Sequence, residues 1–334
     1  MKNNNSLSFV ALIISMLVLS SQVFAKVNVV TSIKPIHSIV ASVMEGIGEP
    51  SLIVDGNASP HTFQFKPSHA KMLQRADIIF WVDKDLESFL EKPLNSIAKK
   101  AKKISLMDLS TVKKLKFREK NIFVDSHKGH KDHDDHKGHK DKGHKDHDDH
   151  KGHKDHDDHK GHEGHAHGEY DVHIWLDPEN AKIMSLEIAK ELSKIDPSNK
   201  SIYESNAKKF SLKINEMIKE IKKEIKKDSA FVVFHDAYQY FEKRFDVNVV
   251  GALTVNPEVL PGAKQLAKIR EEIEHEKVKC LFSEPQFNPN IAKAIAKDTG
   301  IKIAVIDPLG ANLNPSKNLY IDLIKSIAGS FKNC

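Results

Sequence analysis

A histidine-rich run is the most direct sign of chemistry in this sequence. Fourteen histidines lie between Ser126 and Gly168, interleaved almost entirely with Lys, Asp and Gly. Imidazole is the commonest protein ligand for borderline transition metals, and nearby carboxylates can assist it. Ala166 is the only aliphatic residue here, so we expect loop 126–168 to be disordered when metal-free. Its histidines form an expected auxiliary set of weak metal ligands: His127, His130, His133, His136, His139, His144, His147, His150, His153, His156, His159, His162, His165 and His167.

The tract has two interpretations. Its unit HKGHKDHDD starts at residues 127 and 150 and recurs in trimmed form elsewhere. Such repeats expand easily, so the tract could be an insertion that a surface loop tolerates. It could instead collect metal and hold it at high effective concentration beside His173, a few residues downstream.

Three isolated histidines outside the tract lie where loops of the predicted sheets would converge. His61 lies in the loop ASPHTFQF, His173 in DVHIWLDPENA, and His235 at the end of AFVVFH. Asp307 occupies the matching place after the last strand, IAVI. Ligands of open α/β sheets bind outside the carboxyl ends of the strands, so we expect these four residues to meet in a cleft between lobes. Three imidazoles and one carboxylate suit tetrahedral Zn²⁺ and disfavour Mn²⁺.

Other residues near these positions are less clearly connected with metal binding. His37 is expected to have a packing or capping role rather than to support a ligand. For Glu284, a role in supporting a metal-binding side chain and the absence of such a role are equally open. We expect His69 and His275 to face solvent, and Trp175 and Phe287 to belong to the core.

Short apolar runs alternate with helical patterns in both halves of the chain, which is typical of parallel βαβ units. Between the halves, apolar residues recur at three- and four-residue spacings over 198–227, which predicts one helix about 45 Å long. The predicted fold class is α/β, with two lobes joined by this long helix. The predicted divisions are a signal peptide over 1–25, an N-terminal lobe over 26–195, a linking helix over 196–228 and a C-terminal lobe over 229–334.

The first 25 residues resemble a secretory signal, with Lys2, an apolar stretch and a small residue at Ala25. An uncleaved anchor helix is the alternative, although the apolar run is short for a membrane span. No cysteine lies near the cleavage point, so we expect a soluble periplasmic protein that is not a lipoprotein. The formal charge of +5 comes from 51 basic and 46 acidic residues without interleaved aromatics, which argues against nucleic acid as a partner. The two cysteines, Cys280 and Cys334, suggest one disulfide, with two free thiols as the alternative.

Six segments together resemble a known family: SPHTFQFKPS, HIWLDPENA, FVVFHDAYQYFEKRF, PGAKQLAKI, LFSEPQFNP and VIDPLG. They are similar to those of zinc-specific periplasmic solute-binding proteins of bacterial ABC importers (ZnuA-like, of the metal-binding cluster A-I family). The resemblance covers essentially the whole mature chain. It implies two (β/α)₄ lobes on one rigid backbone helix, with a metal cleft between the lobes. It also implies a monomer that captures Zn²⁺ and delivers it to an inner-membrane permease driven by a cytoplasmic ATPase.

The same resemblance assigns residues. It implies His61, His173 and His235 as zinc ligands, Asp307 as a weaker fourth ligand, and a disulfide between the two cysteines. Manganese members of the wider family have a glutamate where this chain has His235. Some relatives have a glutamate just before the first ligand histidine, where this chain has Ser59 and Pro60. The sequence therefore leaves open whether Asp307 or water completes the shell.

Three alternative functions are weighed against a zinc receptor. One is a receptor for manganese or another divalent metal, and another is a metal buffer or metallochaperone based on the tract. The third is a zinc hydrolase, since three histidines and an open position also describe catalytic zinc. No HExxH motif occurs, and no carboxylate is placed by sequence as a general base for metal-bound water. We therefore expect a protein that is not an enzyme.

Overall fold

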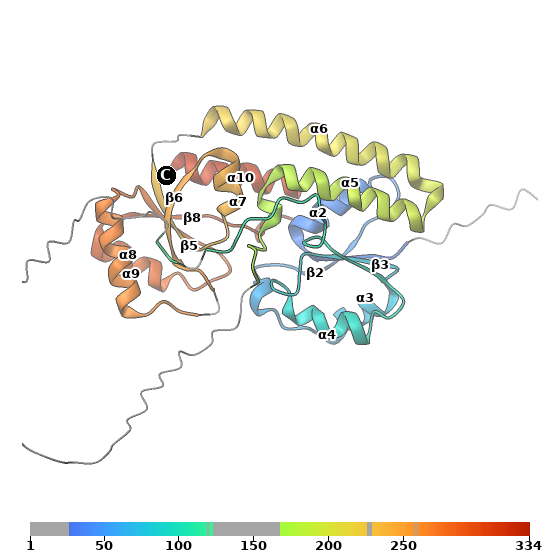
Figure 1. Ribbon diagram of the computed structural model, residues 1–334, viewed down its shortest axis with the longest axis horizontal. Coiled ribbons are helices and arrows are strands. Elements are labelled where there is room, and N and C mark those ends of the chain that lie inside the picture. The colour runs from blue at the N-terminus through green and yellow to red at the C-terminus, as the bar shows by residue number, and fades with distance from the viewer. Residues whose placement is uncertain (1–26, 119, 123–167, 226–228, 258) are drawn as a thin grey trace, which may run out of the picture.

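Two four-stranded parallel sheets form the framework of the protein (Figure 1). The computed structural model describes residues 27–118, 120–122, 168–225, 229–257 and 259–334. The N-terminal sheet has the order β2-β1-β3-β4. Its strands are β1 (Val29–Ile33), β2 (Ser51–Val54), β3 (Ile78–Trp81) and β4 (Lys102–Ser105). The predicted signal peptide and most of the histidine tract lie outside the described residues.

The helices of this lobe begin where local signals place them. Pro67 and Pro178 occupy the first turns of α3 and α5, where a missing N–H costs no hydrogen bond. The Asp177 side chain accepts a hydrogen bond from Glu179 N at the start of α5. The α-helices in the described part of this lobe are α2 (Lys34–Val43), α3 (Pro67–Arg75), α4 (Ser88–Ser96) and α5 (Pro178–Ile195).

The C-terminal lobe repeats the topology of the first. Its sheet has the order β6-β5-β7-β8, so the second strand along the chain is again at the edge. The strands are β5 (Ala230–His235), β6 (Asn248–Thr254), β7 (Cys280–Ser283) and β8 (Lys302–Val305). The helices are α7 (Gln239–Phe245), α8 (Ala263–His275), α9 (Asn290–Thr299) and α10 (Leu319–Asn333). The predicted α/β class with two parallel sheets is confirmed.

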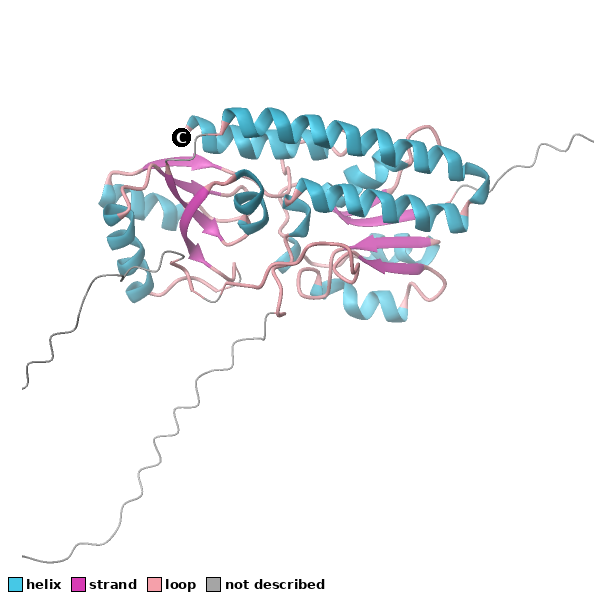
Figure 2. Ribbon diagram, turned by 45° about the horizontal axis from the view of Figure 1, so that its top comes forward, coloured by secondary structure: helices cyan, strands magenta, loops and turns pink. Residues whose placement is uncertain are grey.

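The long helix α6 (Lys200–Glu224) runs along both lobes (Figure 2). It packs against α2 and α5 of the N-terminal lobe and against α10, which follows the last strand. The predicted apolar stripe on this segment is buried: Tyr203, Ala207, Phe210, Ile214, Met217, Ile221 and Ile225. Helix α6 lies within the range 196–228 predicted for the linking helix; the boundaries of the lobes stay a prediction.

Direct hydrogen bonds hold the two lobes together near the strand ends. Lys34 Nζ at the start of α2 donates to the carbonyl oxygen of Ala311 at 2.8 Å. The Trp175 indole donates to Pro308 O at 2.9 Å, and Tyr320 OH donates to Trp175 O at 2.7 Å. These contacts turn the carboxyl ends of the strands in the two sheets toward a common space.

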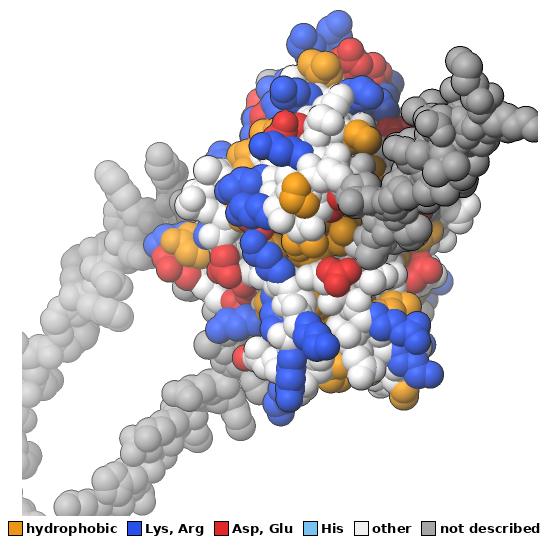
Figure 3. Space-filling model, turned by 90° about the vertical axis from the view of Figure 1, so that its right-hand side faces the viewer, with side chains coloured by type: hydrophobic (Ala, Val, Ile, Leu, Met, Phe, Trp, Pro, Cys, Tyr) orange, Lys and Arg blue, Asp and Glu red, His pale blue; other side chains and the backbone are white. Residues whose placement is uncertain are grey.

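Cys280 at the start of β7 and Cys334 at the C-terminus form a disulfide, with 6.0 Å between their Cα atoms. The predicted pairing is confirmed. At the N-lobe end of the molecule, basic and acidic side chains are interspersed with apolar ones (Figure 3). Among the described residues, no helix combines the length and the apolar character needed to cross a membrane.

Candidate metal centre

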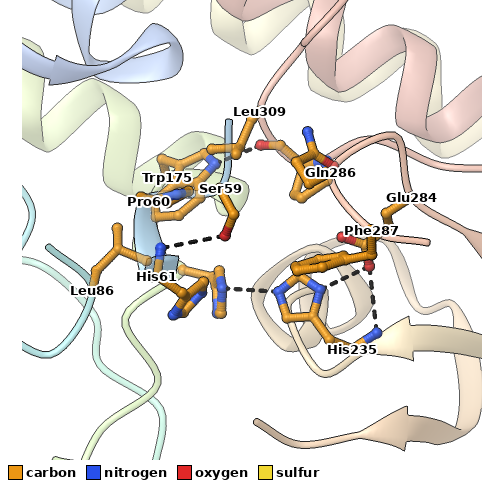
Figure 4. A pocket seen from close by; sticks show the side chains of 12 residues that line it. Ser59, Pro60, His61, Leu86, Trp175, His235, Glu284, Gln286, Phe287 and Leu309 are labelled. Atoms are coloured by element: carbon orange, nitrogen blue, oxygen red, sulfur yellow. Dashed lines mark hydrogen bonds and ion pairs between the residues drawn. The ribbon is translucent and has the colours of Figure 1, made fainter. Parts of the chain in front are cut away.

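His61 comes from the loop after β2. The chain turns there through a short 3₁₀ helix, Pro60–Thr62, and Ser59 Oγ accepts a hydrogen bond from His61 N at 3.3 Å. The proline fixes the first backbone angle of this turn. The imidazole is half-buried and lines the cavity (Figure 4).

His173 precedes another 3₁₀ helix, Ile174–Leu176, and is buried. Asp171, two residues earlier, orients it. Asp171 Oδ1 accepts from the backbone N–H of His173 at 3.0 Å and lies 2.7 Å from its Nδ1. When His173 is neutral with its proton on Nδ1, this contact leaves the Nε2 lone pair free for a metal.

His235 is the last residue of β5, and a carboxylate orients it in the same way. Its Nδ1 lies 2.8 Å from Oε1 of Glu284, which follows β7 in the same sheet. Because β5 and β7 are parallel neighbours, their carboxyl ends place the two residues side by side. Of the two possibilities left open for Glu284, this contact favours support of His235.

The three imidazoles converge on one point between the lobes. One ring nitrogen from each of His61, His173 and His235 lies within 4.8 Å of the others. The Nε2 atoms of His173 and His235 are 3.4 Å apart. Two nitrogens bound tetrahedrally to Zn²⁺ at 2.0–2.1 Å are about 3.3 Å apart, so this pair matches zinc coordination.

The histidines line a narrow cavity with contributions from both lobes. Its other walls are largely apolar: Pro60, Leu86, Trp175, Phe287, Pro308 and Leu309. Trp175 is buried as predicted for a core residue, whereas Phe287 is partly buried and forms part of the wall. An apolar surround of this kind limits solvent access to a bound metal.

The two buried histidines have opposite pKa shifts. Burial lowers the pKa of His173 well below its usual value, and the nearby His235 lowers it further. Burial also acts to lower the pKa of His235, but the charges of Glu284, Asp236 and Asp171 outweigh it, so this pKa is raised. Burial raises the pKa of Asp171 to about 7 despite its hydrogen bond from His173 N and the charge of Arg118.

The structure does not bring Asp307 into the three-histidine group. Its carboxylate accepts hydrogen bonds from the backbone N–H groups of Leu309, Gly310 and Ala311 and from Gln286 Nε2. These donors occupy both oxygens and hold the loop after β8 in its turn. In this conformation Asp307 holds the loop whose residues Pro308 and Leu309 line the cavity.

The other histidines of the described residues lie outside the three-histidine group. His37 is buried, and its Nε2 lies 3.2 Å from Pro50 O, as the packing interpretation predicts. The expectation that His69 faces solvent is wrong: it is buried beside Phe63 and Phe65, and its Nδ1 accepts from Lys66 N at the start of α3. His275 is exposed as predicted.

Two features were not predicted from the sequence. One is the role of Asp171, although a side chain two residues before His173 has the spacing at which Asp caps a turn. Glu272, His275 and Glu276 form a second set of three potential donors at the end of α8, but this set offers a single imidazole. The fourteen tract histidines, His127 to His167, all lie outside the described residues.

Removing the charge of either orienting carboxylate should weaken metal binding. For Asp171→Asn and for Glu284→Gln we expect about 10–100-fold lower Zn²⁺ affinity, because each change loosens the ring orientation and lowers ligand basicity. Competition with a chelator measures the loss. Glu191→Gln, a buried carboxylate on α5 that pairs with Lys102 and Lys194, is the control and should keep wild-type affinity. Equal affinities in all three variants would contradict the orienting role.

A cleft between two like α/β lobes, lined by three convergent imidazoles, defines a two-lobed metal-binding protein. The family model described as "Zinc-uptake complex component A periplasmic" matches residues 29–334. The chain is 43% identical over 336 residues to the high-affinity zinc uptake system protein ZnuA of Brucella abortus (strain 2308), covering 100% of this chain and 99% of that protein. The chain belongs to the ZnuA family of periplasmic zinc-uptake components.

Solved structures share the fold. A crystal structure of ZnuA has a TM-score of 0.69 at 21% identity, covering 92% of this chain and 98% of that one. A manganese-bound periplasmic metal-binding protein from Candidatus Liberibacter asiaticus has a TM-score of 0.68 at 21% identity, covering 92% and 99%. Proteins of this fold thus include one solved with manganese, so the choice of metal has to be argued from the donor atoms.

Proposed function

We propose that this protein is a high-affinity periplasmic receptor for Zn²⁺ that delivers the ion to an ABC importer. The observation that carries the proposal is the convergence of three imidazoles, two of which have Nδ1 held by a buried carboxylate. Family membership supports the delivery step, because the relatives are zinc-uptake components. The partners would be an inner-membrane permease and its cytoplasmic ATPase.

His61, His173 and His235 are the proposed zinc ligands. Asp307 remains the proposed source of a fourth oxygen, with water as the alternative. For Asp307 to coordinate, one of its oxygens must exchange backbone N–H donors for the metal, so the loop 308–311 would have to shift. An Asp307→Asn variant that keeps wild-type zinc affinity would favour water.

The donor set favours zinc over manganese. Three neutral nitrogen ligands suit Zn²⁺, whereas Mn²⁺ prefers oxygen donors. The carboxylates nearest to the histidines, Asp171 and Glu284, contact Nδ1 atoms, on the side of each ring away from the other imidazoles. Because these carboxylates contact Nδ1 atoms, neither is in position to act as a base for metal-bound water. We therefore propose that the protein is not an enzyme.

Further parts of the proposal concern processing and assembly. We propose that residues 1–25 are a cleaved signal peptide, that the mature protein is not lipid-anchored, and that it acts as a monomer. The confirmed Cys280–Cys334 disulfide supports an oxidising compartment.

The competing metal-buffer hypothesis is tested by deleting residues 127–167. Under the receptor hypothesis one tight zinc site per chain survives, because its three ligands all lie outside the deletion, while several weaker sites disappear. Isothermal titration of both proteins with Zn²⁺ measures the stoichiometry. Loss of all tight binding would place the function in the tract instead. If the tract collects zinc, the deletion strain should also grow more slowly at limiting zinc.

A further inference from the structure

One short segment connects the two ligand-bearing regions. Residues 115–118 and 120–122 are here called the strap. They come after β4 of the N-terminal lobe in the sequence and cross to the C-terminal lobe. At its start the strap pairs with the segment that leads to His173: Phe117 N donates to Glu169 O at 3.2 Å, and Asp171 N donates to Leu115 O at 2.9 Å. Lys116 and Tyr170 form an antiparallel bridge there.

The other end of the strap is bonded to the edge of the C-terminal sheet. Ala252 N in β6 donates to Asn121 O at 2.8 Å, and Ile122 forms an antiparallel bridge with Gly251. The Asn121 side chain donates to Ala252 O at 3.1 Å and to Leu253 O at 2.9 Å. Strand β6 pairs with β5, which ends in His235, so this bond holds the strand that carries the third histidine.

Between these ends Arg118 reaches two carboxylates of the C-terminal lobe, the buried Asp236 and the partly buried Glu242. Its Nη2 donates to Glu242 Oε2 at 2.8 Å, and its Nε lies 3.5 Å from Asp236 Oδ2. Asp236 follows His235 directly. The second oxygens of Asp236 and Glu242 have no hydrogen-bond partner within the described part of the chain. Arg118 therefore compensates charges that would otherwise be costly to bury where the lobes meet.

We propose that the strap is a positioning element that sets the separation between His173 and His235, and thereby the rate at which the cleft releases zinc. Arg118 and Asn121 act through these contacts and do not touch the metal. This inference rests on the proposed zinc site. His173 and His235 belong to different lobes. Without the strap, the 3.4 Å distance between their Nε2 atoms would depend on the remaining interlobe contacts alone.

Gly251 offers a test that leaves the site chemistry untouched. A Cβ at this position would lie 2.8 Å from Asn121 O, a backbone atom that cannot rotate away. Gly251→Ala should therefore push the strap off β6. Gly329 in α10 is the matched control, because a Cβ there meets nothing within 4 Å.

The experiment uses the full mature chain and three measurements. Spin labels on Lys71→Cys in α3 and Lys297→Cys in α9 report the distance between lobes in metal-free protein. Stopped-flow transfer of Zn²⁺ to a chelator gives the dissociation rate, and the visible spectrum of bound Co²⁺ reports ligand geometry. Gly251→Ala should broaden the distance distribution, change the Co²⁺ bands and speed dissociation roughly tenfold, a typical coupling between sites. Gly329→Ala should match the wild type in all three.

Arg118 variants give a second test. Arg118→Met should speed release more than Arg118→Lys, because methionine removes the positive charge and lysine keeps it. Arg118→Lys should still differ from the wild type, because lysine cannot bridge both carboxylates. The proposal is overturned if Gly251→Ala retains wild-type distances, spectra and dissociation, or if Lys and Met at position 118 behave alike. If the wild type itself lacks a tight zinc site, the proposed function fails. The metal-free distance measurement then still tests the strap.

Discussion

His235→Ala should lose tight zinc binding, with affinity falling more than about 100-fold, because changes to supporting residues alone cost about 10–100-fold. The alanine removes one of the three nitrogens and leaves Glu284 buried without its histidine partner. Chelator competition at low free Zn²⁺ measures the change, since weaker sites elsewhere stay empty under those conditions. Circular dichroism checks that the fold persists.

The control for this prediction is His275→Ala, which removes an exposed imidazole on α8. It should keep wild-type affinity. If His235→Ala retained tight binding, the cleft would not be the high-affinity site, and the proposed receptor mechanism would have to be abandoned.

Zinc affinity should decline as pH falls, and the decline should begin with His235. Its raised pKa means that it takes up a proton in the metal-free protein at a higher pH than an ordinary histidine, whose pKa is about 6.5. Zinc must displace that proton. His173, with its lowered pKa, stays neutral further into acid and adds competition only there. Each histidine that must lose a proton on binding raises Kd about tenfold per pH unit below its pKa.

Titrations across the histidine range, with Kd plotted on a logarithmic scale, check this pattern. Kd should be flat at high pH, rise below the pKa of His235, and steepen in acid as His173 joins. In Glu284→Gln the onset should move to lower pH, because the carboxylate charge that raises the pKa of His235 is gone. Undiminished affinity at about pH 5 would rule out the imidazole ligands.

Much of the fold could be predicted because it follows local rules. The α6 stripe from Tyr203 to Ile225 has the helical period, and all its predicted members are buried. Strand ends in parallel sheets meet at one edge, so the positions of His61 and His235 at or after strands made their convergence predictable. His173 directly follows no strand among the described residues. The disulfide was predictable from two cysteines in a chain that the sequence predicts to be exported.

Side-chain partners were harder to predict, because they depend on direction as well as position. Asp307 and Glu284 both follow strands of the same sheet, yet only Glu284 contacts a histidine of the site. The Asp307 carboxylate turns instead to the backbone N–H groups of its own loop. His69 has a helical position that suggests exposure, but packing against Phe63 and Phe65 buries it.

By itself the sequence determined the α/β class, the long helix, the imidazole chemistry and the family, since residue type and spacing carry all of these. Tertiary structure alone decided which carboxylates orient His173 and His235 and how residues 115–118 and 120–122 join the two lobes. The reason is physical: hydrogen bonds between Arg118 and Glu242, or between Asn121 and β6, link residues more than a hundred positions apart. Such contacts are set by the docking of the lobes and leave no local periodicity in the chain.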